Sequence, residues 1–221
     1  MKEKMIFFEK CRVFNEQMYN KFKFSEFEIS SLKNNEKLNK MFEVMEIETE
    51  LNVFSNLFAC MISNIIYQQV AFKVARYSEV MLFDYLQYDV SPEAILKIDD
   101  KTFKRFKIFG KRMDYIRNFA NFTVENQSFF SNIDTYSEEE IFDILIKIPG
   151  IGNWSIEMFF IFGLTKNDIL SLQDLIIVKG LKRLYGEVDL TAVKVEINDY
   201  ATITSVNLWK FIEKEFYKQI K

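Results

Sequence analysis

The ten residues Leu145-Ile146-Lys147-Ile148-Pro149-Gly150-Ile151-Gly152-Asn153-Trp154 decide how we interpret the fold of this chain. They lie between two apolar helical stripes, so they join two helices through a tight loop. Gly150 and Gly152 permit positive φ and let another backbone approach without a Cβ in the way. Amides of this loop and of the helix that begins near Trp154 form a site for an anion such as a phosphodiester. The alternative is a plain helical hairpin with a glycine C-cap.

The composition around this loop predicts an all-α protein. Of 221 residues, 49% are apolar, and only 6 Gly and 2 Pro interrupt the chain, which favours helices with short joints. Apolar periodicity predicts a helix over 31–44, another from Phe54 to Ile65 and a third through about residue 86. Helix starts are predicted at Ser91-Pro92 and at Ser137, where Glu140 completes a capping box. We expect one helical body folded as two lobes flanking a cleft.

Several kinds of chemistry are excluded by the residue counts. The chain has no His, which removes Ser-His-Asp and Cys-His catalysis and His-ligated zinc. Its two cysteines, Cys11 and Cys60, are too few for a four-thiolate metal site and read as reduced thiols. The sequence predicts no signal peptide, and polar residues interrupt the apolar stretch 51–70, so we expect a cytoplasmic protein that does not enter a membrane.

Basic residues are clustered although the net charge is −3. Residues 101–117 hold seven Lys or Arg against one Asp, and a second cluster comprises Lys179, Lys182 and Arg183. Such clusters are typical of a surface that binds nucleic acid. The alternative for each cluster is an ordinary solvated helix face.

The hairpin resembles that of the helix-hairpin-helix DNA glycosylase superfamily, in which a catalytic Asp follows the Gly/Pro-rich loop by some two dozen residues. Here Asp174 follows Gly150 by 24 positions and precedes the helical stripe of Ile177, Leu181 and Leu184. The alternative for Asp174 is a simple helix N-cap, and the two roles are compatible.

The similarity is greatest to the alkyladenine, or 3-methyladenine, DNA glycosylase II branch and covers about residues 30–212. Its first core helix ends in a pattern similar to residues 65–71 (IIYQQVA), and 115–120 (YIRNFA) resembles another of its helices. Tyr200 with Leu208-Trp209 resembles its C-terminal element. The chain departs from the branch at Leu172, where a Pro is usual, and at Ala201, where an Arg is usual.

The resemblance implies roles for particular residues. Asp174 would be the catalytic carboxylate, and Trp154 and Trp209 would line the base pocket, with core packing as the alternative for both. Gln69 would enter the vacated base stack, unless it is a helix-terminal Gln that makes local hydrogen bonds. A Lys that forms a Schiff base in bifunctional members is replaced here by Trp154, which has no amine. The resemblance also implies contacts to the DNA backbone at Gly150, Ile151, Gly152 and Lys179. It further implies that a monovalent cation (K⁺ or Na⁺) binds the carbonyls of Ile146, Ile148 and Ile151.

Together these features predict a monofunctional glycosylase that hydrolyses the N-glycosidic bond of a damaged, alkylated purine during base excision repair. We expect it to act as a monomer on double-stranded DNA and to need no cofactor for the chemistry. We assign residues 28–221 to the glycosylase domain and 1–27 to an N-terminal extension of unknown role. The alternatives are a non-catalytic helix-hairpin-helix module that recognises DNA or its damage, and a helical protein–protein adaptor.

Overall fold

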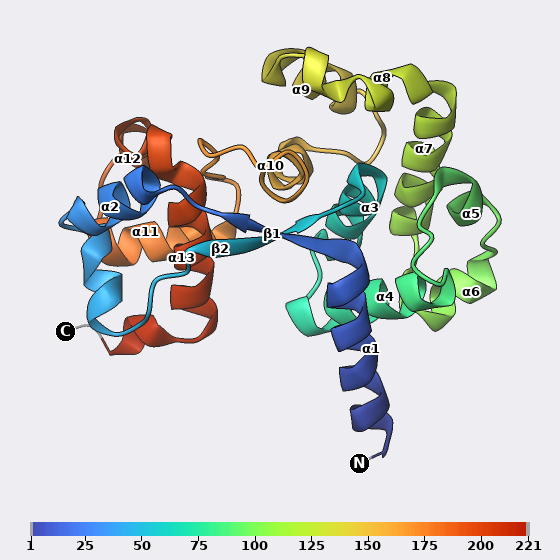
Figure 1. Ribbon diagram of the computed structural model, residues 1–221, viewed down its shortest axis with the longest axis horizontal. Coiled ribbons are helices and arrows are strands. Elements are labelled where there is room, and N and C mark those ends of the chain that lie inside the picture. Colours follow the sequence, from blue (N-terminus) through green and yellow to red (C-terminus); the bar gives the residue numbers. More distant parts are fainter. Residues whose placement is uncertain (1, 220–221) are drawn as a thin grey trace. The chain divides into compact units, whose positions relative to one another are not determined.

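The computed structural model describes residues 2–219, and almost all of its regular structure is helical (Figure 1). The prediction of an all-α fold is therefore confirmed. One feature that the sequence did not predict is a two-stranded ribbon of β1 (Tyr19–Lys23) and β2 (Glu50–Phe54).

The chain forms two compact units, as predicted. Unit 1 holds the described residues up to Asn20 together with Phe54–Phe159, and unit 2 holds Lys21–Val53 and the described residues from Phe160 onward. The chain passes from one unit to the other after Asn20, after Val53 and after Phe159, so neither unit is a continuous segment. The predicted boundary between residues 27 and 28 remains a prediction.

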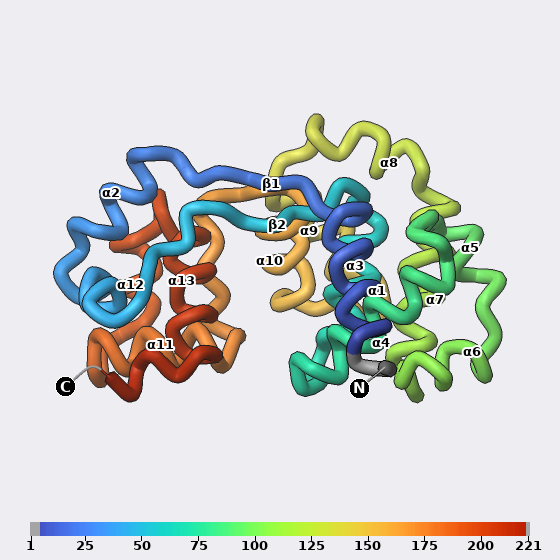
Figure 2. The backbone as a smooth tube through the Cα atoms, turned by 60° about the horizontal axis from the view of Figure 1, so that its bottom comes forward, coloured from blue at the N-terminus to red at the C-terminus, as the bar shows by residue number. Residues whose placement is uncertain are grey.

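Unit 1 is built around α3 (Leu57–Tyr67), whose residues Phe58–Ile66 are all buried. This helix packs against α4 (Phe72–Tyr85) and α7 (Lys111–Glu125), as Figure 2 lets the reader follow. The other elements of this unit are α1 (Lys2–Met18), α5 (Pro92–Leu96), α6 (Asp100–Arg105), α8 (Gln127–Ser131), η2 (Ile133–Thr135), α9 (Glu138–Leu145) and most of α10 (Asn153–Phe162).

The N-terminal helix α1 is an integral part of unit 1, although its sequence shows no clean periodicity. It packs on α4, where Arg76 donates to Asn15 at 2.6 Å and lies over the ring of Phe14. The same guanidinium pairs at 2.8 Å with Glu79, which is completely buried and also accepts a hydrogen bond from Ser63. A buried carboxylate requires such partners, so these contacts fix α1 to the body of unit 1.

Unit 2 is built on the pairing of α11 (Leu175–Tyr185) with α13 (Ala201–Glu213). The two helices approach closely at Gly180, where a Cβ would lie 2.8 Å from Cδ2 of Leu208. Its remaining elements are α2 (Glu26–Asn34), η1 (Leu38–Glu43), α12 (Leu190–Glu196), η3 (Asn198–Tyr200) and η4 (Phe216–Lys218).

Buried polar side chains of α13 hold the segment that leads into α11. Thr202 donates to the carbonyl of Lys166 at 2.7 Å and accepts from the amide of Ile169 at 3.1 Å. Ser205 donates to the carbonyl of Ile169 at 2.9 Å. Because these bonds replace the solvation of buried backbone groups, they fix the path of the chain just before residue 174.

The predicted helix starts at Ser91 and Ser137 are confirmed, whereas the helix predicted from Phe54 begins only at Leu57, because Phe54 belongs to strand β2. Ser91 caps α5 with Pro92 in the first helical position, Ser137 and Glu140 form the capping box of α9, and Gly110, with φ +58°, precedes α7. The predicted helix over 31–44 is wrong, because α2 ends at Asn34 and a 3₁₀ turn covers Leu38–Glu43. The side chain of Asn35 accepts from the amides of Lys37 and Leu38, a local alternative to helical bonding that ends α2.

Candidate functional site

The hairpin loop of unit 1 depends on glycine at position 150. Gly150 has φ +100°, and a Cβ there would lie 2.1 Å from the ring carbon Cγ of Tyr115 on α7. The backbone conformation and the packing against Tyr115 thus both exclude a side chain. The expectation that this glycine allows positive φ is confirmed.

The second glycine of the loop, Gly152, differs from Gly150 in backbone conformation and in surroundings. Gly152 does not adopt positive φ, so only Gly150 uses the conformational freedom that both glycines have. A Cβ at Gly152 would have no described atom within 4 Å, and the residue is exposed. Within residues 2–219 no neighbouring atom requires the lack of a side chain here.

Side-chain amides from α7 and from the end of α3 hold the loop in place. Asn118 donates to the carbonyl of Pro149 at 3.2 Å, and Gln68 donates to the carbonyl of Gly150 at 2.8 Å. Gln68 also donates to the hydroxyl of Ser155 at 2.8 Å, in the first turn of α10. The sequence analysis missed this role of Gln68, whose signal is the first Gln of the Gln-Gln pair at the end of a core helix.

The neighbouring residue, Gln69, lies in a different environment from Gln68. It is exposed in the turn between α3 and α4 and adopts φ +52°, an uncommon conformation for a residue other than glycine. The alternative interpretation, a helix-terminal Gln that makes hydrogen bonds, describes Gln68 instead. Gln69 is therefore at the surface, and Phe72, the first residue of α4, is 57% exposed.

Much of the basic segment 101–117 is used inside unit 1. Arg105 lies over the ring of Phe106, and Lys107 over that of Tyr77. Arg117 pairs with Asp100 at 2.6 Å. For Arg105, Lys107 and Arg117, these contacts favour the alternative interpretation, in which the basic segment is an ordinary solvated helix face.

Two further basic residues begin α7, close to the end of α3. Arg112 donates to the carbonyl of Ile66 at 3.4 Å, and burial lowers the pKa of this guanidinium. Its neighbour Lys111 is exposed. The start of α7 is thus the part of the basic segment that adjoins the Gln68–Gln69 turn.

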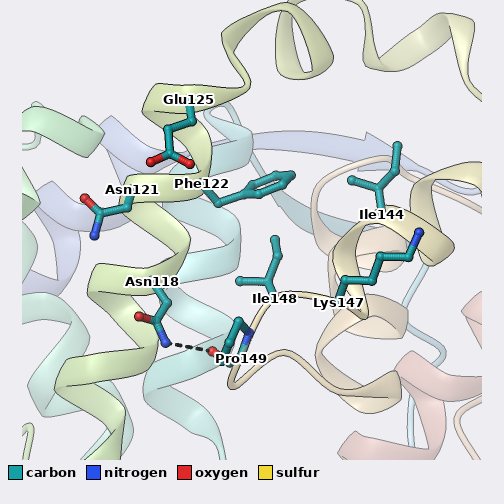
Figure 3. A pocket seen from close by; sticks show the side chains of 8 residues that line it. All are labelled: Asn118, Asn121, Phe122, Glu125, Ile144, Lys147, Ile148 and Pro149. Atoms are coloured by element: carbon teal, nitrogen blue, oxygen red, sulfur yellow. Dashed lines mark hydrogen bonds between the residues drawn. The ribbon is translucent and has the colours of Figure 1, made fainter.

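A shallow pocket of about 370 Å³ lies beside the hairpin in unit 1. Figure 3 shows Asn118 reaching the carbonyl of Pro149 at one edge, with Phe122 facing Ile148 across the pocket. The sequence analysis did not predict it. Its lining residues are Asn118, Asn121, Phe122, Glu125, Ile144, Lys147, Ile148 and Pro149.

The predicted catalytic residue of unit 2 caps a helix and faces an aromatic side chain. Oδ1 of Asp174 accepts from the amides of Ile176 and Ile177 at 2.8 and 3.1 Å, so the N-cap interpretation is confirmed. Its other oxygen, Oδ2, accepts from the indole Nε1 of Trp209 at 3.3 Å. Asp174 is half-buried. The two roles are compatible, because one oxygen serves the helix and the other lies at the indole.

Trp209 is therefore a neighbour of Asp174 and not only a packing residue. Its ring stacks on that of Phe162, with centroids 5.6 Å apart and planes 19° from parallel, and it remains half-buried. Phe162 was not predicted from the sequence because it closes an apolar helix in which Ile156 and the residues Met158–Ile161 are buried. The predicted partner Trp154 is also half-buried, but it belongs to the first turn of α10 in unit 1.

Unit 2 contains two more charged residues of interest, Glu213 on α13 and Lys179 on α11. Glu213 lies one turn beyond Trp209 on α13; burial and, to a lesser extent, Asp174 raise the pKa of its carboxyl, which Lys214 lowers. The predicted DNA contact Lys179 is exposed on α11 and donates to the hydroxyl of Tyr217 at 3.3 Å, with its ammonium over that ring.

The hairpin carbonyls offer the oxygen ligands that a monovalent cation takes. The carbonyl of Ile148 already accepts from the amide of Ile151 at 3.0 Å, and those of Pro149 and Gly150 accept side-chain amides. Among the residues that the structure describes, no cluster of three Cys, Asp or Glu suits a metal ion. A cation at this loop would therefore depend on backbone carbonyls such as those of Ile146, Ile148 and Ile151.

Each unit thus brings together part of the predicted site. In unit 1 the structure assembles the hairpin, Gln69 and Trp154, and in unit 2 it joins Asp174 to Trp209. Within the described range of the chain, every helix is too short or too polar to cross a membrane.

Comparison with known proteins supports one family. No protein-family model matches the chain. The Bacillus subtilis protein YfjP, which its name assigns provisionally to the DNA-3-methyladenine glycosylases, is 25% identical over 179 residues, 75% of this chain and 62% of that protein. The chain thus spans less than two thirds of the length of this curated relative.

Solved structures agree with this relationship. A DNA-3-methyladenine glycosidase from Bacillus halodurans is similar over 90% of this chain and 96% of its own, with 25% identity and a TM-score of 0.66. The Schizosaccharomyces pombe 3-methyladenine DNA glycosylase Mag1, in complex with abasic DNA, gives a TM-score of 0.73 at 21% identity over 86% of this chain and 97% of its own. In its fold, its hairpin and its spaced aspartate, the chain is similar to the helix-hairpin-helix DNA glycosylases.

Proposed function

We propose that the chain is a monofunctional DNA glycosylase that releases a damaged, alkylated purine by hydrolysis of its N-glycosidic bond. The observation that carries this proposal is the half-buried carboxylate of Asp174, with one oxygen fixed by two helix amides and the other at the Trp209 indole. Similarity to 3-methyladenine glycosylases supports the substrate class.

The chemistry of Asp174 follows from the charge that develops in the reaction. Positive charge builds on the sugar as the base leaves, and a fixed carboxylate stabilises it without having to reorganise. The same carboxylate orients or deprotonates the water that attacks C1′. Asp174 is suited to this task because the amides of Ile176 and Ile177 hold its orientation.

The hairpin is suited to hold the DNA backbone. The first amides of a helix lack intrahelical partners and favour a phosphate. Gly152 leaves open space in front of the start of α10, and Gln68 and Asn118 keep the loop rigid. The carbonyls of Ile146, Ile148 and Ile151 would hold a K⁺ or Na⁺ ion, whose charge would strengthen phosphate binding.

The base must leave the duplex stack, which costs a few kcal/mol. Stacking on the Trp209–Phe162 pair would offset this cost, and a cationic alkylated purine adds cation–π attraction. Exposed Gln69 would fill the space that the base vacates, and the contact of Trp154 with the base remains a prediction. Since Trp154 stands in place of the Schiff-base Lys, we expect hydrolysis without strand cleavage. A monomeric state and a cytoplasmic location remain predictions.

The test is Asp174→Asn, with Asp189→Asn as a matched control. Both aspartates cap helices of unit 2 and accept an amide two residues ahead, and Asn preserves capping. On duplex DNA treated with a methylating agent, we expect Asp174→Asn to lower the rate of base release by at least about 100-fold, with little change in DNA affinity. Asp189→Asn should match the wild type.

Two outcomes would contradict the proposal. Undiminished turnover by Asp174→Asn would remove this residue from the chemistry. If the wild type released no base from methylated, deaminated or oxidised DNA but still bound it, the chain would be the non-catalytic recognition module instead.

A further inference from the structure

An exposed apolar segment follows the Gln68–Gln69 turn of unit 1. Of residues 70–74 (VAFKV), Val70 is half-buried and the other four are exposed. Phe72 is 57% exposed and Val74 is 37% exposed, both in the first turn of α4. A single exposed apolar residue is ordinary on a protein surface, whereas several gathered in one place indicate a surface that contacts another molecule.

The ring of Phe72 lies against a neighbour that is held in place. Its centroid is 5.7 Å from that of Tyr67, with the two planes at 58°. The hydroxyl of Tyr67 donates to Glu79 at 3.1 Å, and this buried carboxylate also accepts from Ser63 at 2.6 Å and pairs with Arg76 at 2.8 Å. Because this network fixes Tyr67, Phe72 offers an exposed ring that loses little conformational freedom on binding.

Hydrogen bonds join the turn before Phe72 to two other loops of unit 1. Gln68 donates to the carbonyl of Gly150 in the hairpin at 2.8 Å. Arg112, at the start of α7, donates to the carbonyl of Ile66 near the end of α3 at 3.4 Å. The exposed apolar segment is therefore continuous with the hairpin that is proposed to hold the DNA backbone.

The charges along these loops favour a polyanion as the partner. Lys73 follows Phe72 directly, and Lys111 is the first residue of α7; both are exposed. Asp114, the acid in the first turn of α7, is exposed as well. Exposed cations beside an exposed aromatic ring are the combination with which proteins bind both the phosphates and the bases of DNA.

We infer that Phe72 contacts DNA, and that its ring packs on the face of a base beside the position that the flipped nucleotide vacates. This inference rests on the proposed function. It deepens that function by adding an aromatic contact to Gln69, which would fill the vacated position itself. Phe72 lies just beyond residues 65–71, on which the resemblance to known glycosylases rests.

The strength of this contact depends on the state of the base stack. In an intact duplex neighbouring bases cover each other, so an apolar side chain such as Phe must first unstack them. Where a nucleotide has left the stack, the face of the next base is open, and an aromatic ring stacks on it without that cost. Phe72 therefore raises the affinity for DNA with a gap in the stack more than the affinity for intact duplex.

The experiment compares Phe72→Ala with Phe27→Ala as a matched control. Phe27 is also an exposed phenylalanine at the start of a helix: it is the second residue of α2, is 61% exposed and belongs to unit 2. Fluorescence anisotropy measures the affinity of each variant for a duplex that carries one tetrahydrofuran abasic-site analogue and for the same duplex without it. Melting temperatures show whether each variant is folded.

For Phe72→Ala we expect a loss of about tenfold in affinity for the abasic duplex, the scale of one base–aromatic contact, with affinity for the intact duplex within about twofold. Phe27→Ala should match the wild type on both duplexes. An equal loss on both duplexes, or no loss on either, would overturn the inference.

Two further variants test whether the flat ring is what matters. Phe72→Tyr keeps the aromatic face and should retain the preference for the abasic duplex. Phe72→Leu keeps apolar bulk against Tyr67 but has no flat face, so it should lose the preference while the turn stays folded. Full preference in Phe72→Leu would reject stacking by Phe72.

Because binding to the abasic analogue needs no base release, the experiment separates this inference from the proposed function. If the wild type released no base but Phe72→Ala still lost its preference for the abasic duplex, the inference would stand and the proposed function would fail. If the wild type released bases while Phe72→Ala bound both duplexes as the wild type does, only the inference would fail.

Discussion

The hairpin of unit 1 and the Asp174 site of unit 2 are stabilised in different ways. The hairpin of unit 1 is a backbone structure, in which side chains from other helices donate to the carbonyls of Pro149 and Gly150. The Asp174 site of unit 2 is a side-chain structure, in which a carboxylate receives two amides of its own helix and an indole from another. The sequence of the hairpin is therefore constrained by shape, whereas that of the Asp174 site is constrained by chemistry.

The largest effect on stability should come from Gly150, and the second hairpin glycine, Gly152, serves as its control. Gly150→Ala would force a Cβ into the ring of Tyr115 at positive φ, and we expect a loss of about 3 kcal/mol in the free energy of unfolding. Gly152→Ala meets no described neighbour, so stability should stay within about 0.5 kcal/mol. Chemical denaturation measures both variants.

Measurements of DNA binding by Gly150→Ala and Gly152→Ala distinguish a glycine that the fold requires from one that contacts DNA. If Gly152 is open because a phosphodiester approaches it, Gly152→Ala should weaken DNA binding at unchanged stability. Full DNA affinity in this variant would show that the hairpin is only an internal joint. A weak dependence of binding on salt would point the same way.

A smaller effect should distinguish the two adjacent glutamines. Gln68→Leu removes both hydrogen bonds and leaves the carbonyl of Gly150 without this donor, which should cost about 2 kcal/mol of unfolding free energy. Gln69→Leu changes an exposed side chain and should leave stability within about 0.5 kcal/mol. Thermal unfolding compares them, and equal effects would contradict the division of roles between Gln68 and Gln69.

The smallest expected effect concerns Trp209. The variant Trp209→Phe keeps the stacking on Phe162 but loses the Nε1–H donor to Asp174, so the carboxylate of Asp174 is held less firmly. We expect kcat to fall about tenfold, on the scale of one hydrogen bond to a charged group, with little change in melting temperature. Unchanged kcat would mean that Trp209 only packs, as the alternative interpretation of the sequence holds.

Local features of the fold were predictable because they depend on residues three or four positions apart. The capping box of Ser137, the Ser91-Pro92 start and the cap at Asp174 are such features, and the structure confirms each. The helix over 31–44 was wrong for a local reason as well, since the side chain of Asn35 competes with helical bonding. Apolar periodicity alone does not register this competition.

The candidate site was predictable as a set of residues but not as an arrangement. The hairpin motif and the spacing to Asp174 are readable in the sequence, yet Phe162 carries no comparable signal and Gln68 only that of the Gln-Gln pair. Each gains its importance from a neighbour distant in the chain: Gln68 from the carbonyl of Gly150, and Phe162 from the ring of Trp209.

The sequence by itself therefore determined the helical class, the hairpin and the carboxylate, because short-range sterics, capping and motif spacing are written in neighbouring residues. Only the tertiary structure decided that each unit is made of two separate segments of the chain. It also decided that α1 belongs to unit 1 and that the Trp209 indole lies at Asp174. The physical reason is that packing and long-range hydrogen bonds join residues whose separation along the chain says nothing about their distance in space.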